Sequence, residues 1–183
     1  IMKHPMHKIP AENRRYYFLG LSLATISMMI IFNAIGIPMQ TPSAPYGIIS
    51  YELAGSIMRV EKILASWDHQ ARLRAAFSLG LDYLFMLVYA SAISLACIWA
   101  AQAIRARGLP FGGAGEALAW GQWLAALLDA IENVALTLML WGNVVNPLPQ
   151  MAQWCAILKF GLIFMGLTYA FLGLVFSWVV LSR

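Results

Sequence analysis

The chain has 183 residues, of which 61% are hydrophobic and only 11% are charged, and its formal net charge is +4. Soluble domains contain roughly 45–50% apolar and about 25% charged residues, so this composition excludes an ordinary soluble domain. It also excludes a disordered chain, which needs low hydrophobicity and high charge. An all-α integral membrane protein with several spanning helices remains.

Four stretches are long and apolar enough for a helix to cross the hydrocarbon core of a bilayer, which takes about 20 residues. They are residues 16–37, 75–102, 117–141 and 152–181. Each is predicted to be a helix, because an isolated strand leaves its backbone groups without hydrogen bonds in lipid. The sequence therefore predicts a single transmembrane domain, residues 1–183, built as a four-helix bundle.

Lysine and arginine are unevenly distributed over the segments that flank these spans. Seven fall on the side of the N-terminus and four on the opposite side. The seven are Lys3, Lys8, Arg14, Arg15, Arg105, Arg107 and Arg183, and the four are Arg59, Lys62, Arg72 and Arg74. Because cytoplasmic segments are enriched in these residues, both termini are predicted to be cytoplasmic, in a bacterial-type inner membrane or a plasma membrane.

The first loop, residues 38–74, is the only long segment outside the predicted spans. Its first part is rich in proline, which excludes a regular helix there. From Ser50 onward, apolar residues recur at intervals of three and four, at Leu53, Ile57, Val60, Leu64 and Trp67. This spacing predicts one amphipathic helix over about 50–68. The helix lies either on the outer leaflet or over the bundle, and the sequence leaves both placements open.

The sequence lacks the side chains that several cofactors need. Its three histidines, His4, His7 and His69, lie outside the predicted spans, so a bundle with two axial haem ligands is excluded. Cys97 and Cys155 fall at opposite ends of their helices, roughly 20 Å or more apart, so no disulfide redox centre is predicted. No metal and no other cofactor is predicted. The flanking basic residues favour contact with membrane lipids over binding of nucleic acid.

Four ionisable side chains lie inside the predicted spans, at Asp82, Asp129, Glu132 and Lys159. Each costs on the order of 2.5–3.5 kcal/mol near the centre of a spanning helix, so the four must be paired, protonated or hydrated. At 1.5 Å per residue they lie about 10–18 Å from the outer edge of the membrane, and Asn33 lies about 6 Å from it. The spans thus predict a polar cluster in the outer half of the bundle.

The spacing of these residues predicts how they are arranged. Asp129, Glu132 and Asn133 stand at i, i+3 and i+4, which puts them on one face of their helix. On the second span, Asp82 and Tyr89 are seven residues apart and share a stripe. We expect the lysine of the fourth span to pair with Glu132 or Asp82. At least one of the three acids is expected to be protonated, because one ammonium cannot compensate three carboxylates, and such groups titrate together.

Two interpretations of this cluster remain open. In the first, the protein is a non-enzymatic binding module or an accessory subunit of a membrane complex, with membrane lipids, other membrane subunits or a small amphipathic ligand as partners. In the second, it is an intramembrane enzyme that acts on a lipidic substrate. There Asp129 and Glu132 are the catalytic acid and base, and Lys159 or Tyr89 stabilises developing charge. The sequence contains no catalytic motif, which favours the first interpretation. Buried polar residues can also serve only to hold helices together, which is the role expected for Asn33.

Overall fold

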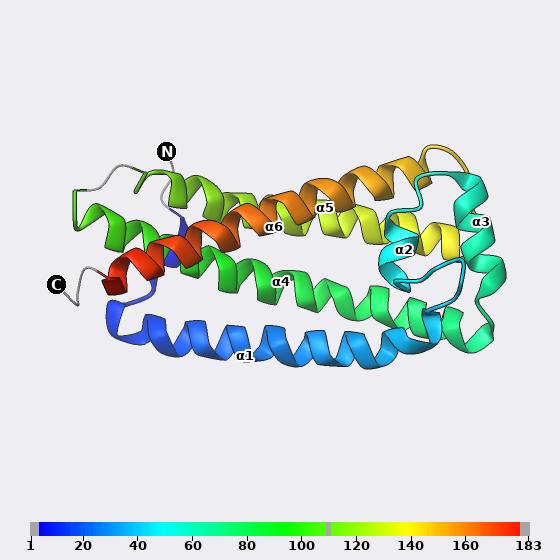
Figure 1. Cartoon of the computed structure of the whole chain (residues 1–183), viewed down its shortest axis with the longest axis horizontal. Coiled ribbons are helices and arrows are strands. Elements are labelled where there is room, and N and C mark those ends of the chain that lie inside the picture. Colours follow the sequence, from blue (N-terminus) through cyan, green and yellow to red (C-terminus); the bar gives the residue numbers. More distant parts are fainter. Residues whose placement is uncertain (1–3, 109–110, 180–183) are drawn as a thin grey trace. The chain divides into compact units, whose positions relative to one another are not determined.

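The computed structural model describes residues 4–108 and 111–179, which contain helices and no strand (Figure 1). Four helices are long: α1 (Ala11–Gly36), α4 (His69–Arg105), α5 (Ala114–Leu140) and α6 (Leu148–Val179). The short elements are the 3-10 helices η1 (Pro5–Lys8) and η2 (Ile37–Met39) and the α-helices α2 (Ile48–Glu52) and α3 (Ile57–Ser66). Lys3 and Arg183, which were counted for the topology, lie outside the described residues, as does the end of the fourth predicted span, residues 180–181.

Each of the four predicted spans corresponds to one long helix. The prediction of an all-α chain with four long apolar helices is therefore confirmed. By length and composition all four can cross a membrane, which suggests a membrane location.

Local sequence explains where several of the long helices begin and end. Helix α1 ends at Gly36, and Pro38 follows within the next turn, where its ring excludes a continued α-helix. The side chain of Asp68 caps α4, because its Oδ1 accepts a hydrogen bond of 2.7 Å from the backbone N–H of Ala71. Pro149 stands in the first turn of α6, where a missing N–H costs nothing.

The chain divides into two compact units. Unit 1 consists of residues 1–25, 87–126 and 159–183, and unit 2 consists of residues 26–86 and 127–158. Each long helix contributes residues to both units.

In unit 2, the segment between α1 and α4 packs against the ends of the long helices. We call this segment, residues 37–67, the cap. One hydrophobic core joins cap residues Met39, Ala44, Tyr51, Ala54, Val60, Ile63, Leu64 and Trp67 to helix residues Ala71, Ala75, Leu79, Ala135, Leu136, Met139 and Ala152. The apolar side of α3 is thus covered by protein within unit 2.

Hydrogen bonds from polar side chains fix the cap in unit 2. The hydroxyl of Tyr51 donates to the backbone carbonyl of Leu136 in α5 at 3.0 Å, and Nε1 of Trp67 donates to a carbonyl of η2 at 2.8 Å. The side-chain amide of Gln153 in α6 donates to the carbonyl of Leu53 at 3.2 Å. The rings of Tyr51 and Trp67 also meet edge to face, with centroids 5.3 Å apart. These contacts attach the cap to both α5 and α6.

The segment predicted as one helix over about 50–68 contains two helices, because the chain turns between Leu53 and Ser56. Gly55 there has a φ of +66°, which favours glycine, and a Cβ at this position would overlap the side-chain amide of Gln153. Ser56, rather than Ser50, is the N-cap of α3. The apolar spacing persists across the turn, which is why the sequence alone favours a continuous helix.

In unit 1, side chains from α4 and α5 bond the backbone of neighbouring helices. Ser94 donates to a carbonyl of α5 at 2.8 Å, and the amide of Gln122 donates to a carbonyl of α6 at 2.9 Å. The thiol of Cys97 lies 3.4 Å from the carbonyl oxygen of Gly166. A Cβ on Gly166 would overlap the amide of Gln122, so this close approach requires glycine.

Candidate functional site

The acidic residues predicted on one face of α5 are buried in unit 2. Asp129, Glu132 and Asn133 expose only 2%, 0% and 2% of their surface. The side-chain amide of Asn133 donates a hydrogen bond of 2.7 Å to Oδ2 of Asp82 on α4. We call these four residues the acidic ridge. Five of the predicted cluster residues therefore belong to unit 2, namely these four and Asn33, and a hydrogen bond joins Asn133 to Asp82.

The acidic ridge adjoins the hydrophobic core of unit 2. Leu79, one turn before Asp82, and Leu136, one turn after Glu132, both belong to the hydrophobic core of unit 2. In such surroundings a polar group interacts more strongly than in water and is costly to leave without a partner. Asp82, Asp129 and Glu132 each have an interaction partner. Asn33, in contrast, is exposed on α1.

Two predicted cluster residues, Lys159 and Tyr89, belong to unit 1. They are buried there, with 5% and 4% of their surface exposed. The Nζ atom of Lys159 lies 5.0 Å from the centroid of the Phe160 ring, a distance typical of a cation–π contact. The pairing of Lys159 with Glu132 or Asp82 stays a prediction.

A polar network in unit 1 links η1, α1, α4 and α5. Glu116 accepts a hydrogen bond of 3.1 Å from Nη1 of Arg105, and the same carboxylate oxygen lies 3.2 Å from Nε2 of His7. Gln102 joins His7 at 3.3 Å through Nδ1 of the imidazole, and Arg14 donates to the amide oxygen of Gln102. The sequence interpretation missed this network, because it considered the arginines only for topology and His7 only as a haem ligand.

His4 is the most deeply buried histidine of the N-terminal segment. It exposes 1% of its surface and meets the ring of Trp120 edge to face, with centroids 4.8 Å apart. Its Nδ1 accepts a hydrogen bond from the backbone N–H of Met6 at 3.3 Å. Burial lowers the pKa of His4, the charge of His7 lowers it further, and Glu116 opposes the shift. His4 therefore anchors this segment as a neutral ring near pH 7.

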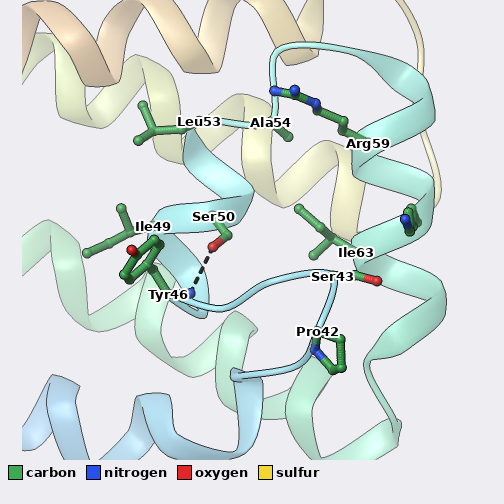
Figure 2. A pocket seen from close by; sticks show the side chains of 10 residues that line it. Pro42, Ser43, Tyr46, Ile49, Ser50, Leu53, Ala54, Arg59 and Ile63 are labelled. Carbon is green, nitrogen blue, oxygen red and sulfur yellow. Dashed lines mark hydrogen bonds between the residues drawn. The ribbon is translucent and has the colours of Figure 1, made fainter.

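A pocket of about 360 Å³ opens in the cap (Figure 2). Its walls come from the loop after η2, from α2 and from α3. The lining residues are Pro42, Ser43, Tyr46, Ile49, Ser50, Leu53, Ala54, Arg59, Lys62 and Ile63. In Figure 2, Arg59 extends from α3 toward the chain that follows α2. None of the predicted cluster residues lines this pocket, and the sequence interpretation did not find it.

Residue types that bind metals or form disulfides are not grouped in the described part of the chain. There, no three side chains among histidine, cysteine, aspartate and glutamate lie close enough to hold a metal ion. Cys97 and Cys155 are both buried and carry free thiols.

Comparisons with known proteins give no information on function. No protein-family model, no curated protein and no solved structure matches this chain.

Proposed function

We propose that the protein is an integral membrane protein whose four long helices cross the bilayer, and that it acts as a non-enzymatic binding module or accessory subunit. The observation that carries this proposal is the separation of the pocket from the acids. The pocket is lined by apolar, hydroxyl and cationic side chains and by no carboxylate, imidazole or thiol. The acids of α5 are buried away from solvent.

This separation favours binding over catalysis. A general acid or base must come within hydrogen-bond distance of the reacting atom, about 2.6–3.2 Å. Asp129 and Glu132 expose 2% and 0% of their surface, so a substrate has no access to them in this conformation. Ser43 and Ser50 line the pocket, but a serine nucleophile needs an adjacent base, and the lining residues include none.

The exposed side chains of α1 and α6 support insertion into a membrane. Large apolar side chains are exposed along both helices, whereas soluble monomers rarely expose continuous apolar surfaces of this kind. On α1 they are Tyr16, Tyr17, Leu19, Leu23, Ile26, Met29, Ile30 and Ile31. On α6 they are Trp154, Ile157, Leu158, Phe160, Phe164, Met165, Leu167, Phe171, Leu172 and Val175. Lipid chains or the helices of a partner subunit are the proposed contacts of these surfaces.

The proposed orientation puts both termini in the cytoplasm and the cap on the opposite side. It follows from the excess of lysine and arginine in the segments flanking the N-terminal side of the bundle. Under this orientation the pocket of the cap opens at the outer surface of the membrane.

Labelling of single cysteines tests the membrane topology. Cys97 and Cys155 are buried and are first replaced by alanine. Glu61→Cys on α3 and Gly113→Cys before α5 then introduce exposed thiols, and no atom near Gly113 obstructs a side chain. In intact cells, an impermeant maleimide should label the cysteine at 61 and reach the one at 113 only after permeabilisation. The reverse pattern would refute the orientation, and labelling of both in intact cells would refute the crossing by α4.

The acid variants test whether the ridge is structural. Asp129→Asn and Glu132→Gln should each lower the stability of the detergent-purified protein by about 1–3 kcal/mol, because a buried polar contact is lost. Glu61→Gln, on the exposed side of α3, is the control and should have no effect. Thermal unfolding across pH 5 to 9 measures the difference. Acid variants that are as stable as the wild type, or more so, would contradict the proposal and favour the intramembrane enzyme.

A further inference from the structure

The pocket of the cap carries two positive charges. Arg59 and Lys62 are three residues apart on α3, so they project from the same side of the helix, and both are exposed. Glu61 stands two positions after Arg59 and faces elsewhere. Within the described part of the chain, neither cation has a carboxylate oxygen within 4 Å. The lining of the pocket therefore includes two cationic side chains and no carboxylate.

Hydroxyl groups supply further donors at the same place. Ser50 Oγ accepts a hydrogen bond of 3.0 Å from the backbone N–H of Tyr46, so its own O–H remains available to a ligand (Figure 2). Ser43 lines the pocket as well. The guanidinium of Arg59 offers a planar set of N–H donors, which suits the tetrahedral oxygens of a phosphate group. The donors thus match a phosphate better than a neutral polar ligand.

The rest of the lining is apolar. Ile49, Leu53 and Ile63 are among the lining residues, and in Figure 2 the side chain of Ile63 points from α3 toward α2, whereas those of Ile49 and Leu53 point away from α3. The volume of about 360 Å³ falls within the range of small-molecule sites, roughly 300–1,000 Å³, and exceeds what a bare phosphate ion fills. Tyr46 at the pocket exposes 75% of its surface, so a further apolar contact is available at its rim. A ligand that joins an anionic group to an apolar portion would contact both the cationic and the apolar residues of the pocket.

We propose that the cap pocket binds the phosphate group of an anionic amphipathic molecule, with Arg59 and Lys62 on the phosphate oxygens and the isoleucine and leucine side chains on the apolar portion. The inference rests on the proposed function, because the bilayer orientation brings the pocket to the membrane surface. A phospholipid head group and a soluble phosphate ester share this chemistry, and the experiment separates them.

The test measures ligand-induced thermal stabilisation of the full-length chain in an uncharged detergent. The probes are dihexanoyl phosphatidic acid, dihexanoyl phosphatidylcholine and glycerol 3-phosphate. The wild type should bind the phosphatidic acid at least about tenfold more tightly than the phosphatidylcholine, whose cationic group repels the pocket. Binding of glycerol 3-phosphate with similar affinity would overturn the role of the apolar lining and leave a site for soluble phosphate esters, whereas its failure to bind would assign the site to lipids.

Charge-removing variants show whether the pocket is the site. Arg59→Gln and Lys62→Gln should each weaken binding of the phosphatidic acid about tenfold, and the double variant should weaken it further. Both side chains are exposed, so folding should be preserved, and the melting temperature without ligand verifies this. Arg74→Gln removes an equal charge from an exposed position outside the pocket and should leave the affinity unchanged.

Equal affinity in the wild type and the double variant would overturn the proposal, as would equal binding of the two lipids to the wild type. Either result can occur while the cysteine at 61 still labels from outside, which would leave the proposed membrane topology intact. If the cysteines at 61 and 113 no longer differed in their labelling in intact cells, the membrane topology itself would be refuted.

Discussion

The hydroxyl of Tyr51 offers a sharp test of how the cap is held. Tyr51→Phe removes the 3.0 Å hydrogen bond to the carbonyl of Leu136 and preserves the ring, which packs edge to face with Trp67. Tyr51 exposes 0% of its surface, so the bond is fully shielded from water. At pH 7 its loss should lower the free energy of unfolding by about 1 kcal/mol. For a chain of this length that is a fall of about 2–4 °C in melting temperature.

The pH dependence of this difference follows from the same burial. Burial raises the pKa of Tyr51 well above its ordinary value of 10.0, and nearby Arg72 partly opposes the shift. Between pH 10 and the raised pKa, the folded state therefore retains a proton that the unfolded state has lost. Stability must fall as the pH rises through this window, by up to about 1.4 kcal/mol per pH unit, and it is unaffected below the window. The phenylalanine variant lacks this loss.

The two stability curves should therefore cross. The advantage of the wild type, about 1 kcal/mol at pH 7, should vanish between about pH 10.5 and 11, and the variant should be the more stable protein above that. Equilibrium unfolding followed by tryptophan fluorescence from pH 7 to 11.5 measures both curves. Tyr46→Phe, at an exposed position, is the control. A constant difference across the whole range would refute the burial of the Tyr51 hydroxyl.

Two further predictions concern the turn and the end of α3, and thermal unfolding measures both. Gly55→Ala should destabilise by about 1–3 kcal/mol, because φ is +66° and a Cβ would overlap Gln153. Gly113→Ala should be neutral, because no atom lies within 4 Å of a Cβ at that position. An equal loss of stability in Gly55→Ala and Gly113→Ala would contradict the close contact between Gly55 and Gln153. Arg72→Ala should cost about 1 kcal/mol, because its guanidinium bonds two carbonyls near the end of α3 at 3.3 and 2.6 Å. Arg74→Ala loses the same charge without these bonds, and a similar cost there would indicate a general charge effect.

The long helices could be predicted because their signals are local. A run of about 20 apolar residues predicts a helix without knowledge of its neighbours. The turn at Gly55 could not be predicted in this way, because the contact that requires it comes from Gln153, almost a hundred residues later. The same holds for the cap as a whole. Its spacing of apolar residues shows which side is buried, but not which helices cover it.

The acidic ridge could be predicted from local sequence signals, whereas the pocket could not. Asp129, Glu132 and Asn133 share a helical face by spacing alone, and charge inside an apolar span is costly enough to mark a site. Arg59 and Lys62 carry no such cost in an exposed loop, so the sequence interpretation counted them only for orientation. They form a pocket because the chain after η2 folds back beside α3, and this arrangement has no local signature.

The attachment of the cap to α5 and α6 has a consequence for biosynthesis. Tyr51 and its acceptor Leu136 are 85 residues apart in sequence, and Leu53 and its donor Gln153 are 100 apart. A ribosome adds about 5–20 residues per second, so the cap waits several seconds or more before its partners are made. Until then its apolar side chains lack the residues of α5 and α6 that complete the core around them. The cap is therefore the part of the nascent chain that stays exposed to chaperones and proteases until α6 has been synthesised.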